Sequence, residues 1–384
     1  MKIIVIANLF SGLNSIIKEG EFVNKGSPAY YNFIKYISQH EKCEIIFLQT
    51  QYSKKNKFIE NIHIKKLKKN IKLIGGFNYL YKLKYGAFLN KFIQYILIFY
   101  TTNILHKKSA IYIDRDNILF SYMLTLFNKK NTVRFLGVNE NFYAHIFHKN
   151  NLYSKIIKYI FNNHNVMKVF TKDGSYSELC EKFPNSHLLF NGIDKHEYRC
   201  PNFEEFTISY VGRLEKCKGQ RVLLNTMLLL KESGIKVNII GDGSDRVYLQ
   251  NFIDGNSLHA NVKIIGNINQ EDIYSYLSNS SLFISINYLG IYGNTLLEAS
   301  STGLPIIALN HSYFNDINKK YFYLISENNV TENLKDAILY FYNKECNIKL
   351  YSKKSYEFSR SLYTWEDRIK LEIAMIKKNQ GGEF

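Results

Sequence analysis

"NYLGIYGNTLLEASSTGLPIIALN" (287–310) decides how the second half of this chain is expected to fold. The preceding "SLFISI" (281–286) is short, apolar and rich in β-formers, which predicts a buried strand. Residues 295–302 then change to helical periodicity, with Gly303 and Pro305 placed to end the helix. "PIIAL" predicts the next strand. The segment therefore predicts a strand, a glycine loop, a helix and a second strand.

The glycine loop in this segment predicts a binding site. Gly290 and Gly293 precede the helix, so backbone N–H groups and the positive helix end can face an anion. Glu298 stands one turn into the helix, where its carboxylate can accept hydrogen bonds from hydroxyl groups. The expected ligand carries both an anion and a diol.

Length and composition indicate a folded protein of two domains. The chain has 384 residues, of which 46% are apolar and 15% aromatic. Its five cysteines are odd in number and form no CxxC pair, which favours a reducing compartment over a disulfide framework or a structural zinc. No signal peptide is recognised, and the longest apolar run, residues 92–105, is too short to span a bilayer. We expect a cytoplasmic protein.

The charge is concentrated in the first half. Lys and Arg outnumber Asp and Glu by 30 to 13 in residues 1–200, and the two classes are equal at 20 each in residues 201–384. The first half is therefore expected to favour polyanions or an anionic membrane surface.

Both halves alternate strands with helices, the pattern of a parallel doubly wound sheet. In the second half, strands are predicted at 206–212, 236–243, 261–268, 281–286, 305–309 and 321–325, with helices at 220–233, 245–253, 271–280, 295–302 and 331–344. In the first half, strands are predicted at 2–10, 44–50, 109–114, 131–138 and 166–173, with a helix at 29–39. We predict two α/β domains, 1–200 and 201–364, with a final helix (365–380) crossing back to the first.

"YVGRLEKCKG" places Arg213 and Lys218 just beyond a predicted strand, between Gly212 and Gly219. Two cations at such a position can neutralise a diphosphate. The alternative is a solvated loop with ordinary surface cations. The ordered series of glycine-containing strand ends in this half favours the diphosphate site.

The second half resembles the retaining glycosyltransferases of family 4. The residues that carry the resemblance are "NGID" (191–194), "VGRL" (211–214), "KG" (218–219), "IIGDG" (239–243), "VKIIGNI" (262–268) and "YGNTLLEASSTGLPIIA" (292–308). It covers about 185–310 strongly and the rest only in layout. It implies the GT-B fold, in which two Rossmann-like doubly wound domains face each other across a cleft.

The resemblance also implies roles for individual residues. Arg213 and Lys218 match the pair that holds the diphosphate of the donor, and Glu298 matches the glutamate that binds the nucleotide ribose. The implied donor-binding residues are Gly212, Gly241, Asp242, Gly243, Gly266, Asn267, Ile268, Gly290, Ile291, Tyr292, Gly293, Asn294, Thr295 and Glu298. No cofactor is implied, and we expect activity without a metal.

The chain departs from the family pattern at two positions. Gly290 stands where the family usually has a second glutamate, which contacts the donor sugar. Leu136 lies at about the position where many members carry a histidine after a first-domain strand. A retaining displacement in which the leaving phosphate helps to deprotonate the acceptor needs no strong enzyme base.

Several residues of the first half are candidates for the acceptor side. They are Gly26, Ser27, Asp114, Arg115, Glu140 and His145. "DRD" (114–116) also matches the metal-binding pattern of the other glycosyltransferase fold, GT-A, but a polar strand end is the preferred interpretation. Gly26 and Ser27 equally fit a helix start, and the segment of Glu140 and His145 equally fits a capped surface helix.

The segment 52–108 interleaves lysines with aromatic and aliphatic residues. It contains no recognisable nucleic-acid motif. An interfacial surface with lysines toward anionic headgroups fits better, and lysines such as Lys54, Lys55, Lys65, Lys66, Lys68 and Lys69 are the candidates. The alternative is a solvated face over ordinary helices.

These observations predict a cytoplasmic glycosyltransferase, peripheral on the inner face of the membrane. It would move a sugar from a nucleotide sugar (UDP-, GDP- or similar) to a saccharide, lipid-linked or free, in bacterial polysaccharide synthesis. The alternatives are a nucleotide-sugar epimerase or a glycan phosphorylase of similar fold, and a non-enzymatic protein that binds polyanions or membranes.

Overall fold

The computed structural model describes most of the chain. It leaves out residues 1–2, 7–27, 40–44, 49–63, 69–70, 75–85, 106, 115–116, 136–139, 172–176, 202, 204, 289–292, 311–315 and 382–384. The chain divides into unit 1, formed by the described residues before Gly192 together with the segment from Trp365, and unit 2, Gly192–Thr364. The division falls before the Cys200-Pro201 boundary expected from the sequence and places the last helix with unit 1.

Unit 1 is built on an eight-stranded sheet that is parallel except at one edge, where β3 runs antiparallel to β4. In spatial order the strands are β3 (Ile64–Lys68), β4 (Ile71–Ile74), β2 (Ile45–Leu48), β1 (Ile3–Ile6), β5 (Ala110–Asp114), β6 (Asn131–Phe135), β7 (Val166–Thr171) and β8 (Ser186–Leu189). The described side chains of β1, β6 and β7 are buried along the whole strand, as expected for strands covered by helices on both faces.

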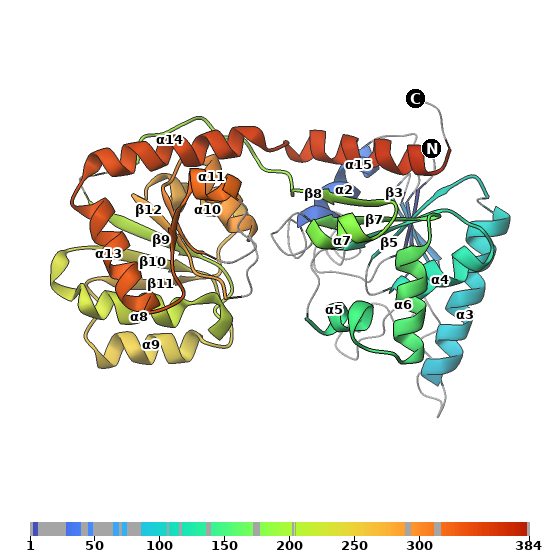
Figure 1. The fold of residues 1–384 in the computed structure, drawn as a ribbon, viewed down its shortest axis with the longest axis horizontal. Coiled ribbons are helices and arrows are strands. Elements are labelled where there is room, and N and C mark those ends of the chain that lie inside the picture. The colour runs from blue at the N-terminus through green and yellow to red at the C-terminus, as the bar shows by residue number, and fades with distance from the viewer. Residues whose placement is uncertain are drawn as a thin grey trace. The chain divides into compact units, whose positions relative to one another are not determined.

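Helices cover this sheet on both faces (Figure 1). On one face α2 (Pro28–Gln39) packs against α15 (Trp365–Asn379). The remaining helices are α3 (Gly86–Tyr100), its π-helical continuation η3 (Thr101–Leu105), α4 (Ile118–Leu126), α5 (Glu140–Phe147), α6 (Leu152–Asn162) and α7 (Ser177–Lys182). The side chain of Asn151 caps α6 by accepting from Ser154 N at 2.8 Å.

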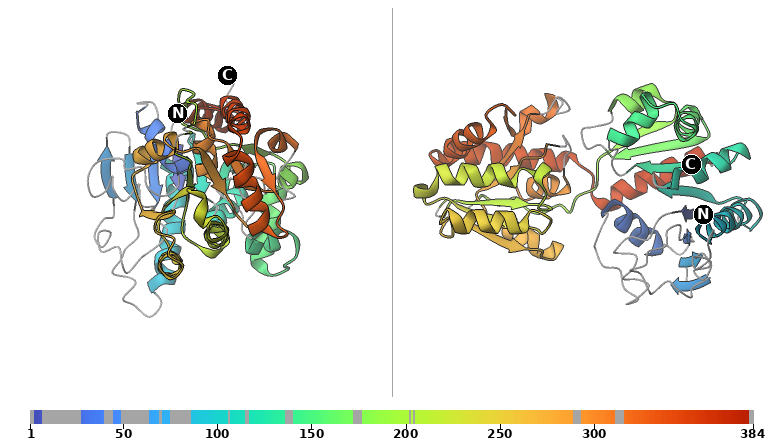
Figure 2. Two further views of the ribbon diagram at one scale, coloured as in Figure 1. Left: turned by 90° about the vertical axis from the view of Figure 1, so that its left-hand side faces the viewer. Right: turned by 90° about the horizontal axis from the view of Figure 1, so that it is seen from below.

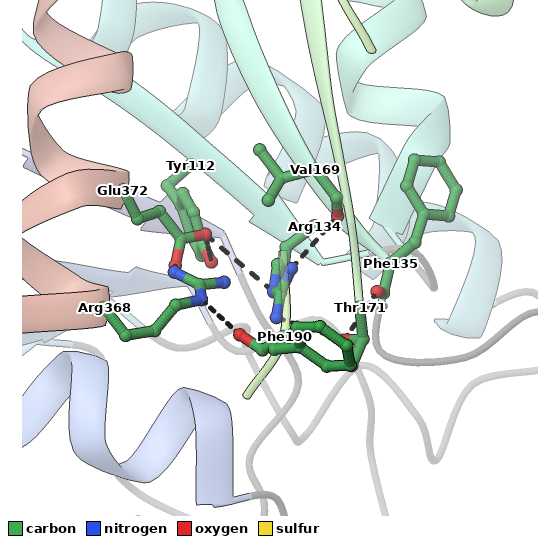
Figure 3. A network of polar contacts seen from close by, with 8 residues as sticks. All are labelled: Tyr112, Arg134, Phe135, Val169, Thr171, Phe190, Arg368 and Glu372. Atoms are coloured by element: carbon green, nitrogen blue, oxygen red, sulfur yellow. Dashed lines mark hydrogen bonds and ion pairs between the residues drawn. The ribbon is translucent and has the colours of Figure 1, made fainter. Parts of the chain in front are cut away.

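A buried ion network anchors α15 to the sheet of unit 1 (Figure 3). Glu372 Oε2 accepts from Arg368 Nη1 at 2.6 Å, and its Oε1 accepts from the Tyr112 hydroxyl at 2.8 Å. Arg134 Nε lies 3.8 Å from the same Oε1. Burial alone would raise the pKa of Glu372, but Arg368 and Arg134 hold it below its ordinary value.

The two guanidinium groups of the network also bind β7 and the residue that follows β8. Arg134 Nη2 donates to Thr171 Oγ1 at 3.1 Å, and Arg368 Nε donates to the Phe190 carbonyl at 2.8 Å. The last helix is therefore tied to β5 by a buried hydrogen bond to Glu372 and to β6 by the ion pair of Arg134 with Glu372, and Arg134 in turn holds β7.

Unit 2 contains a six-stranded parallel sheet. In spatial order the strands are β11 (Val262–Gly266), β10 (Lys236–Ile240), β9 (Thr207–Val211), β12 (Leu282–Ser285), β13 (Ile306–Leu309) and β14 (Tyr323–Ile325). All pairings are parallel. The prediction of two doubly wound α/β sheets is confirmed.

Five helices of unit 2 begin within one residue of the predicted starts. They are α8 (Gln220–Leu229), α9 (Arg246–Gly255), α10 (Gln270–Ser278), α11 (Asn294–Ser301) and α13 (Val330–Tyr342). The sequence pattern did not predict α12 (Asp316–Tyr321), α14 (Glu345–Ser361) or the short helices η5 (Lys216–Lys218) and η6 (Lys231–Ser233). Gly303 follows α11 with φ +80°, the left-handed conformation expected beyond a helix end. Figure 2 shows these helices on both faces of the sheet.

Each unit has its own hydrophobic core. One cluster of buried residues, including Ile208, Leu224 and Phe341, lies in unit 2, and a second, including Ile111 and Phe170, lies in unit 1. Among the described residues, no helix combines the length and hydropathy needed to cross a bilayer.

Candidate functional site

The strand order of unit 2 has one switch point, between β9 and β12. From β9 the chain proceeds outward to β10 and β11, and then returns to the other side of β9 to add β12, β13 and β14. In open parallel sheets, ligands bind beyond the carboxyl ends of the strands at this point. The loop after β9 carries Arg213 and Lys218, and the loop after β12 leads into α11 with Glu298. The three predicted catalytic residues therefore follow the two strands that flank the switch point.

Backbone contacts join these two loops directly. Tyr288 N donates to the Cys217 carbonyl at 2.9 Å. Gly219 has φ +77°, and a Cβ at this position would lie 2.4 Å from Ile286 Cγ2 and 2.8 Å from the Ile286 carbonyl oxygen. Only glycine allows the loop after β9 to approach the end of β12 this closely.

A second close approach lies beside the first, at the end of β10. Gly241 has φ +140°, and a Cβ there would lie 1.9 Å from the Gly212 carbonyl oxygen. Leu214 N donates to the Asp242 carbonyl at 3.0 Å, which holds the loops after β9 and β10 together. The backbone of the loops at the switch point is therefore tightly packed.

The two predicted diphosphate ligands differ in their surroundings. The Arg213 side chain is 73% exposed and its Nη1 donates to Glu215 Oε1 at 2.9 Å. Lys218 is half-buried, and its pKa is lowered first by burial and then by the nearby Arg213, although Cys217 and Glu215 act in the opposite direction. Binding of an anion stabilises such an ammonium more than a fully solvated one, because the ammonium is partly desolvated and lies near a second cation.

Two residues that the sequence analysis did not single out position these cations. The buried Tyr210 hydroxyl donates to the Lys218 carbonyl at 2.8 Å, and Gln220 Nε2 donates to the Arg213 carbonyl at 2.7 Å. Gln220 is fully buried. Tyr210 begins the "YVGRLEKCKG" segment and Gln220 follows it, but an aromatic strand residue and a glutamine at a helix start carry no distinctive signal in a single sequence.

Two helices begin at this switch point, α8 after Gly219 and α11 after Gly293. Both helices have a glycine as the N-cap residue, so no N-cap side chain accepts hydrogen bonds from their first N–H groups. Such helix starts suit an anion. Glu298 lies one turn into α11, and its Oε2 is shielded from solvent.

The remaining predicted donor-binding residues lie at the ends of neighbouring strands and at the start of α11. The loop after β10 contains Gly241, Asp242 and Gly243. Strand β11 ends at Gly266 and is followed by Asn267 and Ile268. Helix α11 begins at Asn294 and Thr295, directly after Gly293. Asp242 Oδ1 accepts from Gly243 N at 2.8 Å, and its Oδ2 lies 3.1 Å from Arg246 Nη1. Gly290, Ile291 and Tyr292 lie outside the described residues.

The acceptor-side candidates lie in unit 1, and two of them have defined contacts. Asp114 Oδ1 accepts from Asn117 N at 2.9 Å and from Asn117 Nδ2 at 2.6 Å, an interaction that stabilises the start of α4. His145 Nδ1 lies 2.9 Å from Ser154 Oγ, and its pKa is lowered by burial and by Lys149. Gly26, Ser27, Arg115 and the side chain of Glu140 lie outside the described residues, as does Leu136.

In the part of the chain that the structure describes, no three His, Cys, Asp or Glu side chains are grouped so that they could hold a metal ion. Around the carboxyl end of the parallel sheet, the described residues provide two cations, two helix starts and one carboxylate, which together can stabilise charge.

The sequence of unit 2 matches a known family. Residues 195–358 fit the family model described as "Glycosyl transferases group 1". Over 142 residues the chain is 28% identical to the O-antigen biosynthesis glycosyltransferase WclY of Escherichia coli, a match that covers 34% of this chain and 39% of that protein. It is 26% identical over 134 residues to the capsular polysaccharide biosynthesis glycosyltransferase CapM of Staphylococcus aureus, covering 34% of each. The match thus spans less than half the length of these relatives.

Solved structures resemble the whole chain. A sucrose-phosphate synthase from Thermosynechococcus elongatus aligns with a TM-score of 0.71 at 13% identity, covering 98% of both chains. The Anabaena protein HepE, solved in complex with UDP, aligns with a TM-score of 0.71 at 12% identity, covering 98% of this chain and 100% of that one. At this level of identity the likeness concerns the fold, which is GT-B.

Proposed function

Since residues 195–358 belong to the glycosyl transferases group 1 family, we propose that the chain is a glycosyltransferase that moves a sugar from a nucleotide sugar to a saccharide acceptor in bacterial polysaccharide synthesis. The observation that carries the proposal is the switch point of unit 2. There Arg213, Lys218 and Glu298 follow the two central strands, and the loops that bear them are joined by backbone contacts.

Each residue has a role in this reaction. Transfer breaks the bond between the anomeric carbon and the diphosphate oxygen and forms a bond from that carbon to an acceptor hydroxyl. Arg213 and Lys218 stabilise the charge that develops on the departing diphosphate, together with the N–H groups at the starts of α8 and α11. Glu298 accepts hydrogen bonds from the ribose hydroxyls.

We propose that transfer retains the anomeric configuration, with the leaving phosphate accepting the proton of the acceptor hydroxyl. This route requires no catalytic side chain at Leu136 or Gly290, the two positions at which the chain departs from the family pattern. It also assigns no step to a metal, so activity is expected to persist in the presence of a chelator.

The Anabaena relative was solved with UDP and with UDP-glucose. UDP sugars are therefore the first donors to test here, with GDP sugars as the alternative. The strongly basic first half supports a lipid-linked acceptor presented at the inner face of the membrane. The lysines at 54, 55 and 69 lie outside the described residues, as do the side chains of Lys65, Lys66 and Lys68.

The test is slow hydrolysis of the donor in the absence of acceptor, measured over a panel of UDP and GDP sugars. We expect release of the nucleoside diphosphate from one or a few donors, and loss of that release in Lys218→Ala. Lys216→Ala, an exposed lysine two residues away, is the matched control. Failure of every donor to bind or to be hydrolysed would contradict the proposal.

A further inference from the structure

Helix α3 and its continuation η3 have two apolar sides, but only one of them is buried. Ile98 is fully buried in the core of unit 1, and Tyr95 packs on Phe120 with ring centroids 4.5 Å apart. The opposite side is exposed and carries large apolar residues, which we call the α3 face: Leu89, Phe92, Ile96, Tyr100, Ile104 and Leu105.

The spacing of these residues shows that they form one surface. Leu89, Phe92, Ile96 and Tyr100 are separated by three or four residues, which places them on the same side of an α-helix. Phe92 is 55% exposed and Ile104 is 61% exposed. A row of large apolar side chains along four turns of a helix is a feature of interaction surfaces rather than of ordinary solvated faces.

A second exposed apolar pair lies beside this face. Phe127, at the end of α4, contacts Phe99 of α3 with ring centroids 4.7 Å apart. Both Phe127 and its neighbour Leu126 are more than half exposed. Figure 1 shows α3 beside α4.

The charges around the α3 face are positive. Lys107 and Lys108 follow η3 and are exposed, and Lys129 Nζ donates to the Lys107 carbonyl, which places Lys129 and the exposed Lys130 at the same end. Within the described elements α3, η3, α4 and α6, the sequence contains no Asp or Glu. An apolar strip whose described charged neighbours in these elements are cationic matches the interface of an anionic bilayer.

We propose that the α3 face docks on an anionic lipid bilayer, with Phe92, Ile96 and Ile104 entering the interface and Lys107, Lys108 and Lys130 pairing with headgroup phosphates. The helix lies in the plane of the interface and does not span the bilayer. A two-fold dimer would instead place the same cationic surround against itself, which is unfavourable. The inference rests on the proposed function for the lipid-linked acceptor. It goes further in assigning the α3 face as the membrane-binding surface and in adding insertion of apolar side chains to the electrostatic attraction of the lysines.

The first test is cosedimentation of the full chain, without nucleotide, with vesicles of phosphatidylcholine alone or of equal parts phosphatidylcholine and phosphatidylglycerol. The wild type should bind the anionic vesicles, and Phe92→Ser/Ile96→Ser should bind them at least about tenfold more weakly, because each exposed side chain loses its transfer out of water. Val247→Ser/Leu229→Ser, which removes two exposed apolar residues of unit 2, is the matched control. Equal binding by both double variants would overturn the proposal.

Charge is tested separately. Lys107→Glu/Lys108→Glu should weaken binding to anionic vesicles and reduce its salt dependence, whereas Lys263→Glu/Lys353→Glu, at exposed lysines of unit 2, should not. Insertion is tested by the tryptophan fluorescence of Phe92→Trp, compared with that of the wild type, whose only tryptophan is Trp365. The emission of the new tryptophan should shift to the blue on anionic vesicles and be quenched by brominated acyl chains. A bound protein whose new tryptophan is not quenched would contradict insertion.

The proposed function fails separately from this inference. Donor hydrolysis is measured without membranes, and Phe92→Ser/Ile96→Ser should retain it, because its changes lie in unit 1. If donor hydrolysis is absent from every variant but vesicle binding follows the pattern above, the docking surface stands and the transferase assignment falls. If light scattering shows a dimer that Phe92→Ser/Ile96→Ser dissociates, the α3 face binds a second copy and the proposal is wrong.

Discussion

Arg213 and Lys218 follow the same strand, yet their side chains start from different states. The guanidinium of Arg213 is largely exposed and paired with Glu215, whereas Lys218 is half-buried with a lowered pKa. In the proposed site, a diphosphate would bind Arg213 through the guanidinium N–H groups that Glu215 does not occupy, and at Lys218 it would offset the desolvation of the ammonium. The backbone carbonyl of each cation is held by a buried partner, so both side chains leave the loop at defined positions.

Arg213→Ala and Lys218→Ala should each slow turnover by roughly 10²–10³-fold, about 2.7–4 kcal/mol, because each cation stabilises charge that develops on the leaving diphosphate. The fall in kcat should exceed any rise in the donor KM. Steady-state kinetics with the donor identified by hydrolysis provides the measurement. Lys216→Ala in the same loop should behave as the wild type; near-normal turnover of Lys218→Ala would remove Lys218 from the site.

Glu298→Gln should act mainly on donor affinity, because a ribose contact is present in both the ground and the transition state. A hydrogen bond to a charged acceptor contributes about 1.5–3 kcal/mol, so the Kd for the nucleoside diphosphate should rise roughly ten- to a hundredfold. Titration calorimetry with UDP measures this directly. Glu232→Gln, an exposed carboxylate of unit 2, is the control. An unchanged Kd for Glu298→Gln would show that the carboxylate does not meet the ribose.

At the scale of elements, the sequence predicted the six strands of unit 2 and five of its helices, but not α12 or α14. The strand expected at 281–286 is β12, the helix expected at 295–302 is α11, and the strand expected at 305–309 is β13. These elements carry strong signals because parallel strands buried on both faces read as continuous apolar runs and the glycines mark their ends. The same glycines mark the loops that carry the residues of the candidate site.

Unit 1 was predicted less completely. Strands β3 and β4 lie in the lysine-rich segment 52–108, where "IKKLK" lacks a clear alternation, and β8 lies beyond the last strand that was predicted for the first half. The ion network of α15 also escaped prediction, because Tyr112 and Glu372 are separated by 260 residues. A single sequence does not show which distant charges meet in a core.

Glu372→Gln should destabilise unit 1 strongly. The change leaves Arg134 and Arg368 buried without a carboxylate, and breaking a buried ion pair in this way costs about 3–5 kcal/mol. Denaturant unfolding followed by circular dichroism measures the loss. Glu366→Gln, on the same helix but in an exposed pair with Lys370, should have no measurable effect. Equal stability of the two variants would contradict the anchoring role of the network.

Lys168 of β7 should make the stability of unit 1 depend on pH. Its ammonium is fully buried, with hydrogen bonds to the carbonyls of Phe161 (2.9 Å) and Asn163 (3.2 Å), and burial lowers its pKa to about 7 from an unfolded value of about 10.5. The unfolded chain binds more protons between these values, so the free energy of unfolding should rise as pH increases from about 7 toward 10.5, by an amount on the order of a few kcal/mol.

Below pH 7 both states carry the proton and Lys168 adds no further pH dependence. Lys168→Met should flatten the rise above pH 7, whereas Lys155→Met, at an exposed lysine of α6, should retain it. Urea unfolding at a series of pH values makes the comparison. A slope that persists in Lys168→Met would assign the pH dependence to other groups.

For the whole molecule, two separate cores predict two unfolding transitions. The buried clusters of unit 1 and unit 2 share no residue, and α15 belongs to unit 1 although it follows the last helix of unit 2 in the sequence. Chains with more than one core often depart from two-state behaviour. Differential scanning calorimetry of the full chain should therefore show two transitions that can be moved independently.

UDP should raise the Tm of the unit 2 transition only, since a ligand that binds the native state stabilises it by RT ln(1 + [L]/Kd), about 2.7 kcal/mol at a hundredfold excess over Kd. Glu372→Gln should lower the Tm of the unit 1 transition and leave the UDP-sensitive one in place, because all of its contacts lie in unit 1. Glu298→Gln should have the reverse pattern: both transitions near their wild-type positions without ligand, and a smaller shift with UDP. A single transition that responds to both variants would show that the two cores unfold as one cooperative unit, and a UDP shift confined to unit 1 would place the donor site in the wrong half of the chain.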